Sequence, residues 1–141
     1  MRIGVPRETR PGERLVAATP RTVAQLVDLG YDVVVERGAG ERASYPDEAY
    51  VEAGASLGDA AQAWGADVVT AVNAPSAAQV AALTPGQMLI AMLAPGASEA
   101  LVQQLADRGV TAWPSTRCRA SRAPSRSTCS ARCRTSPGTV P

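Results

Sequence analysis

Short apolar runs alternate with amphipathic stretches along the first 112 residues of the chain. The apolar runs contain the aliphatic and β-branched residues that favour strands. Strands are therefore predicted at 2–5, 31–36, 68–72, 88–93 and from 110 onward. Between them, apolar residues recur at helical spacing. Helices are predicted after Thr19, over 46–51 and 60–64, from 76 to 83 and from 98 to 109.

Capping residues support these helix boundaries. Thr19 is a favourable N-cap, and Pro20 suits the first helical position because its missing N–H would lack a partner there. Ser76 and Ser98 are the expected N-caps of two later helices, and Gly30 is expected to end the first helix. Alternating strands and helices predict an α/β fold, a parallel sheet with helices on both faces in a Rossmann- or flavodoxin-like arrangement. The near-continuous apolar run at 88–93 favours a strand buried on both faces.

Composition divides the chain at about residue 112. Residues 1–112 carry eight Arg and all thirteen acidic residues, a net charge of −5, whereas residues 113–141 carry six Arg and no acid, a net charge of +6. In the second part Val140 is the only aliphatic residue larger than Ala, so we expect a disordered tail. The chain contains no His and no Lys, which excludes the commonest general base and a P-loop lysine. No apolar run approaches the length of a membrane span, so we expect a cytoplasmic chain with no direct membrane insertion.

Four strings in the first part resemble one known family. They are M-R-I-G-V-P-R-E-T-R-P-G-E-R at 1–14, V-A-A-T-P at 16–20, V-V-V-E-R-G-A-G at 33–40 and D-E-A-Y-V-E-A-G-A at 47–55. Together they resemble the N-terminal domain shared by alanine dehydrogenase and the alpha subunit of proton-translocating NAD(P) transhydrogenase. The resemblance covers about residues 1–112.

Two positions bear on the choice between the two branches of that family, although the transhydrogenases usually keep the Arg that Leu15 replaces, so Leu15 departs from both branches. In alanine dehydrogenase an Arg directly before the V-A-x-T-P string and a Lys before E-P hold the substrate, but here these positions are Leu15 and Asn73. Arg14 lies one position early, and on an extended segment that shift points a side chain the opposite way. The string V-N-A-P at 72–75 is typical of the transhydrogenase. We therefore favour the transhydrogenase branch and take Arg14 and Asn73 as pocket candidates.

The resemblance stops abruptly after Ala112, and the genetic code suggests why. In the reading frame that starts at the third base of the Ala112 codon, the permitted codons allow the following string from the overlap of Trp113 and Pro114 onward: A-I-D-A-V-P-R-I-S-R-A-Q-S-L-D-V-L-S-S-M-P-N-I-S-G-Y-R-A. This string resembles the next segment of the family. We infer that 113–141 is an out-of-frame translation and that the domain formed by 1–112 is incomplete.

The resemblance implies a function for the intact family. Its members transfer hydride from NADH to NADP, coupled through other subunits to proton movement, and form homodimers on the cytoplasmic face of the membrane. NADP is bound by a partner subunit. The R-I-S-R-A-Q-S-L-D segment that lines the nicotinamide pocket is missing from 113–141, as is the Rossmann domain that follows it. We therefore expect this chain alone to be inactive and to bind no cofactor, and we assign no catalytic, cofactor-binding or metal-binding residue.

Other patterns have plainer structural explanations. Gly38-Ala39-Gly40-Glu41-Arg42-Ala43 fits G-x-G-x-x-A, but the residues that follow do not open a helix, so a glycine-rich connection is favoured over a dinucleotide fingerprint. Cys118, Cys129 and Cys133 have no zinc-site spacing. Beyond Trp113, the arginine-rich tail lacks the interleaved aromatic residues of a nucleic-acid arm, so no nucleic acid is expected. Two alternatives stay open: an alanine dehydrogenase-like fragment, and a non-enzymatic α/β binding module.

Overall fold

The structure is a computed structural model that describes residues 1–93 and 99–115. The described strands are β1 (Arg2–Val5), β2 (Asp32–Glu36), β3 (Ser56–Gly58), β4 (Val68–Asn73), β5 (Met88–Met92) and β6 (Thr111–Pro114). The α-helices are α1 (Pro20–Asp28), α2 (Asp47–Glu52), α3 (Ala60–Trp64), α4 (Ala77–Ala82) and α5 (Glu99–Asp107), with a 3₁₀ turn η1 at Glu41–Ala43.

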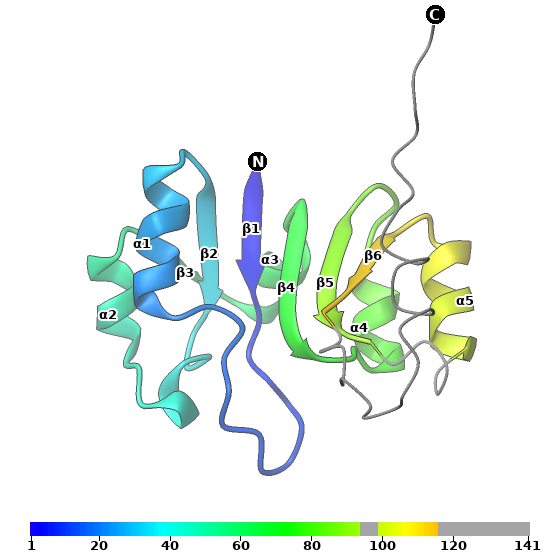
Figure 1. The fold of residues 1–141 in the computed structure, drawn as a ribbon, viewed down its shortest axis with the longest axis horizontal. Helices are drawn as coiled ribbons and strands as arrows, with labels where there is room; N and C mark the ends of the chain where they lie inside the picture. The colour runs from blue at the N-terminus through cyan, green and yellow to red at the C-terminus, as the bar shows by residue number, and fades with distance from the viewer. Residues whose placement is uncertain (94–98, 116–141) are drawn as a thin grey trace, which may run out of the picture.

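The strands form one parallel sheet in the order β3-β2-β1-β4-β5-β6 (Figure 1). The chain winds outward in one direction from β1 to β3 and in the other from β4 to β6, so right-handed crossovers place helices on opposite faces. In Figure 1, α1 lies in front of the sheet, whereas α3 and α4 lie behind it. The predicted fold class is confirmed.

Each face of the sheet has its own, mostly aliphatic core, and alternate residues of β4 and β5 contribute to the two cores. On the α1 side, Val23 packs with Ile3, Val5, Val33 and Val35 in one cluster. On the α4 and α5 side, a second cluster is built on Leu89, Ala91 and Leu105, among others. In the middle strand Gly4 is required because a Cβ there would collide with the Ala63 carbonyl at the end of α3. That close approach places α3 directly beneath β1.

The predicted helix caps are largely present. The Thr19 side chain accepts a hydrogen bond from the Thr22 N–H, Pro20 occupies the first turn, and Gly30 follows the helix with a φ of +88°. Ser76 and Gln79 form a reciprocal capping box at α4. The expected Ser98 cap lies outside the described residues, and so do residues 116–141 of the tail 113–141 that is expected to be disordered. The expectation is wrong at Trp113 and Pro114, which belong to β6.

Three details differ from the sequence prediction. The edge strand β3 was not predicted, because Ser56-Leu57-Gly58 contains a single large apolar residue. Strand β6 continues past residue 112 to Pro114, and the Ser115 N–H donates to the Ala91 carbonyl oxygen at 2.9 Å. The prediction that β5 is buried on both faces is wrong: Leu89 and Ala91 are buried, but Met92 on the opposite face is half exposed. Among the described residues no helix covers that face of β5.

Candidate functional site

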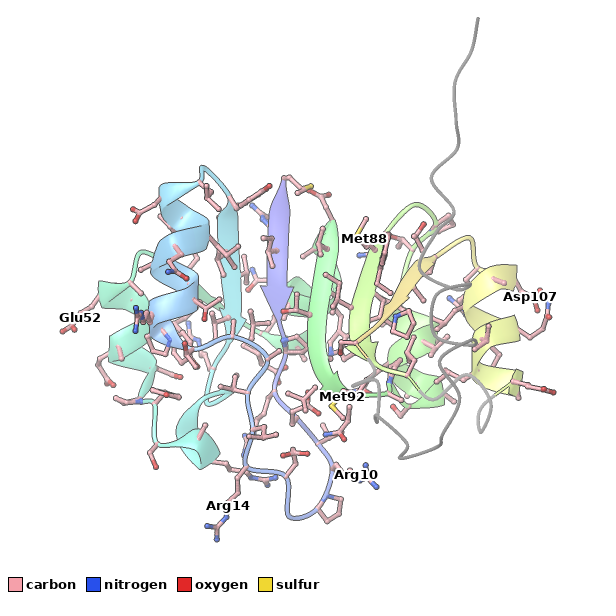
Figure 2. All side chains as sticks on the ribbon, in the orientation of Figure 1. Arg10, Arg14, Glu52, Met88, Met92 and Asp107 are labelled. Atoms are coloured by element: carbon pink, nitrogen blue, oxygen red, sulfur yellow. The ribbon has the colours of Figure 1, made fainter. Side chains whose placement is uncertain are left out.

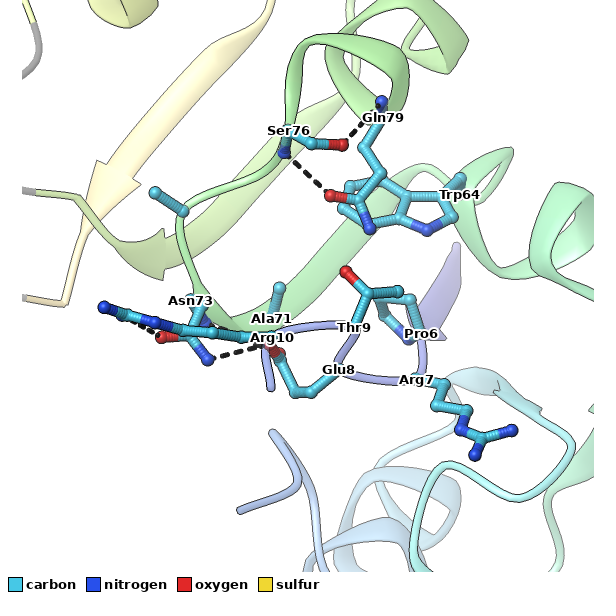
Figure 3. Close-up of a pocket in the computed structure, with 11 residues that line it drawn as sticks. Pro6, Arg7, Glu8, Thr9, Arg10, Trp64, Ala71, Asn73, Ser76 and Gln79 are labelled. Atoms are coloured by element: carbon cyan, nitrogen blue, oxygen red, sulfur yellow. Dashed lines mark hydrogen bonds between the residues drawn. The ribbon is translucent and has the colours of Figure 1, made fainter. Parts of the chain in front are cut away.

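A polar crevice lies where the neighbouring strands β1 and β4 end. The chain leaves β1 toward β2 and leaves β4 toward β5, so the two connections diverge and open a space at the carboxyl edge of the sheet. The crevice has a volume of about 270 Å³. Its walls come from the segments that follow the two strands, together with Trp64 of α3 and Gln79 of α4 (Figure 3). Ligand sites of doubly wound sheets occur at such switch points.

Asn73 joins the two walls of this crevice. Its side-chain nitrogen Nδ2 donates to Glu8 Oε2 at 3.0 Å and to Glu13 Oε2 at 2.9 Å. Its side-chain oxygen Oδ1 accepts from Arg10 Nη1 at 3.1 Å. All three partners belong to the long segment between β1 and α1. The Asn73 amide therefore clamps that segment onto the end of β4.

Glu8 secures the same junction through the backbone. The pairing of β4 with β5 changes register between Thr70 and Asn73, which takes backbone N–H groups out of the regular ladder. The Glu8 carboxylate accepts the N–H of Val72 at 2.6 Å and that of Asn73 at 3.4 Å. The Glu8 carboxylate thus provides hydrogen-bond acceptors for the backbone N–H groups at the irregular end of β4.

Glu13 binds on the outer side of the clamp. Its Oε1 accepts the backbone N–H groups of Arg14 and Leu15, both at 2.9 Å. The hydrogen bond from the Asn73 side chain is the main reason that the pKa of Glu13 is lowered from its ordinary value of 4.5. Glu13 is therefore ionised at neutral pH and fixes the turn that carries Arg14 and Leu15.

The structure separates the two pocket candidates. Asn73 lines the switch-point crevice, whereas Arg14 lines a different surface hollow with Gly12, Glu13 and Arg42. Figure 2 shows the Arg14 side chain pointing outward from the molecule. Leu15 leaves 61% of its surface exposed. Neither position 14 nor position 15 places a cation in the crevice.

The sequence pattern singled out Asn73 but did not identify Glu8, Arg10 and Glu13 as its partners. For Glu8 the sequence did contain a signal, because Glu8 closely follows the buried strand β1. It therefore lies at the carboxyl edge of the sheet, where ligand sites occur. Arg7 and Arg10 also line the crevice, and in Figure 3 their guanidinium groups point to opposite sides of it. The crevice thus offers amide, carboxylate, indole and guanidinium groups, and its two guanidinium groups do not face each other.

A buried tyrosine fixes the far end of the segment between β1 and α1. The Tyr50 hydroxyl of α2 donates to the Ala18 carbonyl oxygen at 3.0 Å, directly before the N-cap of α1. Burial raises the pKa of Tyr50 to about 12, so the hydroxyl stays protonated and keeps donating. The segment is therefore held both near its start by Asn73 and at its end by Tyr50.

The described residues do not form a dinucleotide cradle. The Rossmann fingerprint needs a glycine-rich turn that leads from a strand directly into a helix. Here Gly38-Ala39-Gly40 leads only into the short 3₁₀ turn η1, and the Gly38 N–H donates to the Asp47 carboxylate at 2.9 Å. The segment from Pro6 to Thr19 separates β1 from α1. The residues present therefore do not fit the pyrophosphate of a nicotinamide dinucleotide. In the part of the chain that the structure describes, no cluster of acidic or cysteine side chains could hold a metal ion.

A doubly wound parallel sheet with a polar crevice at its switch point defines the class of α/β ligand-binding domains. Within that class, the profile of the family described as "Alanine dehydrogenase/PNT, N-terminal domain" matches residues 4–124. The chain belongs to this family.

Individual relatives come from both branches of the family. The chain is 46% identical over 93 residues to the NAD(P) transhydrogenase subunit alpha of Haemophilus influenzae, a match that covers 66% of this chain and 18% of that protein. It is 42% identical over 113 residues to the alanine dehydrogenase of Mycobacterium tuberculosis, covering 79% of this chain and 30% of that protein.

A solved structure of similar shape is the transhydrogenase from Sinorhizobium meliloti, at 37% identity and a TM-score of 0.78, with 81% of this chain and 34% of that chain covered. The chain thus spans between 18% and 34% of the length of these three relatives. It resembles the N-terminal region of the NAD(P) transhydrogenase alpha subunit, as the sequence motifs predicted. No helix among the described residues is both long and apolar enough to cross a membrane.

Proposed function

We propose that the chain is an incomplete N-terminal domain of a transhydrogenase-type alpha subunit, and that it supplies one wall of a hydride-transfer site. The proposal rests on the hydrogen bonds of the Asn73 side chain. Its amide is neutral and bonded to three partners of the chain itself, so it holds the fold and is not free to bind a substrate carboxylate. A 2-oxo acid needs a cation beside its carboxylate, and the two positions that hold the substrate in alanine dehydrogenase are the uncharged Leu15 and Asn73 in this chain. A site for nicotinamide alone does not need that cation.

The rest of the site belongs to polypeptide outside the described residues. Because those residues offer no pyrophosphate cradle, the dinucleotide must be held mainly by a further domain. When bound, a nicotinamide cofactor supplies the hydride chemistry, and this chain's part is to hold Asn73 and Trp64 at the switch-point edge. On its own, the chain is expected to bind NADH too weakly to measure and to catalyse nothing.

The proposal extends to the cellular setting. The full assembly would transfer hydride from NADH to NADP on a partner subunit, with proton movement through membrane subunits, and would act as a homodimer at the cytoplasmic face. The Haemophilus influenzae relative is itself named as a subunit, which supports membership of this chain in a larger assembly.

Two chimeras test the proposal against the alanine dehydrogenase alternative. Residues 1–112 replace the matching region of the Haemophilus influenzae alpha subunit in one chimera, and of the Mycobacterium tuberculosis alanine dehydrogenase in the other. We expect the first chimera to retain transhydrogenation and the second to lose pyruvate-dependent oxidation of NADH. Leu15→Arg together with Asn73→Lys should restore pyruvate turnover to the second chimera. Pyruvate turnover without these substitutions, or a folded but inactive first chimera, would contradict the proposal.

A calorimetric titration of the chain with NADH tests the incomplete-site argument separately. The titration should give no saturable heat, whereas the intact Haemophilus influenzae subunit serves as the binding control. Micromolar affinity in the chain itself would show that residues 1–141 contain a dinucleotide site.

A further inference from the structure

Gln87, the residue directly before β5, is a polar residue only 5% exposed to solvent. Its side-chain nitrogen Nε2 donates to the carbonyl oxygen of Trp64 at 3.0 Å and to that of Ala66 at 2.6 Å. Its side-chain oxygen Oε1 accepts the backbone N–H of Thr84. Both amide hydrogens and the amide oxygen are therefore bonded to other parts of the chain.

The three partners define which kind of side chain can serve at position 87. Two carbonyl oxygens need two donors, and one backbone N–H needs an acceptor, all from a single planar group. A carboxylate of the same size would place an oxygen against two carbonyl oxygens. An aliphatic side chain would leave three polar groups without partners in a place that water does not reach. The chemistry of the site therefore calls for an amide.

The carbonyl groups that Gln87 binds lie at the end of α3, a helix of only five residues. The last carbonyl groups of a helix lack partners within the helix, and a helix this short is not stable by itself. Its first turn is fixed by the reciprocal capping box of Asp59 and Gln62. Its last turn is fixed by the Gln87 amide, so α3 is held at both ends.

Trp64 is the last residue of α3, and its side chain connects this fixed end to the crevice. Side chains of an α-helix lean toward the start of the helix, and α3 starts at the carboxyl edge of the sheet because it follows β3. The indole accordingly lines the switch-point crevice together with Thr9 and Gln79 (Figure 3). A shift in the last turn of α3 would therefore move the wall of the crevice.

We infer that Gln87 is a positioning residue for Trp64. From the amino edge of the sheet, its amide sets where the indole stands in the crevice at the carboxyl edge. Gln87 does not line the crevice itself and acts through the last turn of α3. The inference rests on the proposed function only in taking the crevice as the functional site, since the position of Trp64 can be measured without any reaction.

The test follows the fluorescence of Trp64 in the full chain carrying Trp113→Phe, which leaves Trp64 as the only tryptophan. Gln87→Met keeps a side chain of similar length but removes its hydrogen-bonding groups. We expect this variant, folded by circular dichroism, to emit at longer wavelength and to show about twofold stronger acrylamide quenching, because the end of α3 opens locally. Val23→Ala is the control, since it destabilises the front core by leaving a cavity and should change neither reading.

Gln87→Glu in the same background gives a second, reversible test. The ionised carboxylate can only accept hydrogen bonds, whereas the protonated carboxyl group can again donate one to the end of α3. Burial raises the pKa of such a carboxyl group. We therefore expect acrylamide quenching of Trp64 in this variant to weaken between about pH 8 and about pH 5, with no such change in Gln87→Met.

A measurement on the unmutated chain applies even if neither variant folds. The side-chain amide hydrogens of Gln87 should exchange with solvent at least about tenfold more slowly than those of the exposed Gln25, because both are bonded. Equal exchange rates would overturn the inference. A folded Gln87→Met with unchanged Trp64 fluorescence, or an equal change in Val23→Ala, would also overturn it and leave Gln87 a purely structural role.

The first chimera separates this inference from the proposed function. Gln87→Met in that chimera should lower kcat for transhydrogenation, because the displaced indole belongs to the wall of the site. If Trp64 fluorescence changes in the chain but kcat of the chimera does not, the crevice is not part of the hydride-transfer site. That result would contradict the proposed function and still support Gln87 as the residue that positions Trp64.

Discussion

Replacement of Asn73 by Asp would change the attraction between residue 73 and the carboxylates of Glu8 and Glu13 into repulsion, with almost no change in side-chain volume. The Nδ2 donor that now lies 3.0 Å from Glu8 Oε2 becomes an oxygen acceptor. A lost hydrogen bond to a charged group costs about 1.5–3 kcal/mol. Two carboxylates about 3 Å apart repel by roughly 1.4 kcal/mol even in water-like surroundings. We therefore expect Asn73→Asp to lower the free energy of unfolding by about 3 kcal/mol at pH 7.5.

Urea denaturation followed by circular dichroism measures this loss. Glu8→Gln in the Asn73→Asp background should recover much of it, because the new amide can donate to the new carboxylate, and a double-mutant cycle isolates the pair. The loss of unfolding free energy should also become smaller as the pH is lowered. Repulsion raises the pKa of the introduced carboxyl group, so this group takes up a proton and loses its charge. The control is Gln25→Glu, which adds one charge at an exposed position of α1 and should change stability by less than about 0.5 kcal/mol. If Asn73→Asp costs no more stability than the control, the Asn73 side chain does not hold the segment between β1 and α1 onto the end of β4.

Three further predictions concern the fold around the crevice. Gly4→Ala should lower the free energy of unfolding, measured in urea, by about 3 kcal/mol, because a Cβ there meets the carbonyl at the end of α3. Gly12→Ala is the control: the residue lies in open space with a φ of +80°, so the substitution should cost only about 1 kcal/mol. The lowered pKa of Glu13 stabilises the folded state above its ordinary value of 4.5, and that contribution disappears as pH falls through the lower folded value. Glu13→Gln should therefore flatten the dependence of Tm on pH below 4.5, and an unchanged acid limb would contradict this. Tyr50→Phe should cost about 1–3 kcal/mol in thermal melts by leaving the buried Ala18 carbonyl without its donor, and a neutral result would show that water replaces the hydroxyl.

The sequence predicted the winding of the sheet because each large element has a local signal. Thr19-Pro20 begins α1, Ser76 begins α4, and aliphatic runs identify β2 and β4. Strand β3 lacked such a signal because its three residues are specified by pairing with β2 rather than by their own pattern. The exposure of Met92 was also beyond a local pattern, since an apolar run looks the same whether or not a helix covers it.

The candidate site was predicted only in part, for a geometric reason. Asn73 could be singled out because it follows a buried strand in a recognisable string. Its partners Glu8 and Glu13 lie at least 60 residues away in sequence and meet it only because β1 and β4 are neighbours in the sheet. Arg14 is close to Glu13 in sequence, yet its side chain points outward. Strand order therefore determined which polar residues form the crevice, and sequence spacing did not.

We propose that residues 1–112 are the start of a transhydrogenase-type alpha subunit whose continuation lies in another reading frame. Determination of the nucleotide sequence across the codons for residues 110–115 and downstream tests this most directly. The account predicts that the frame opened by the third base of the Ala112 codon stays open and encodes A-I-D-A-V-P-R-I-S-R-A-Q-S-L-D. Stop codons in that frame, or codons that encode an unrelated sequence, would contradict it and favour a separate α/β binding module.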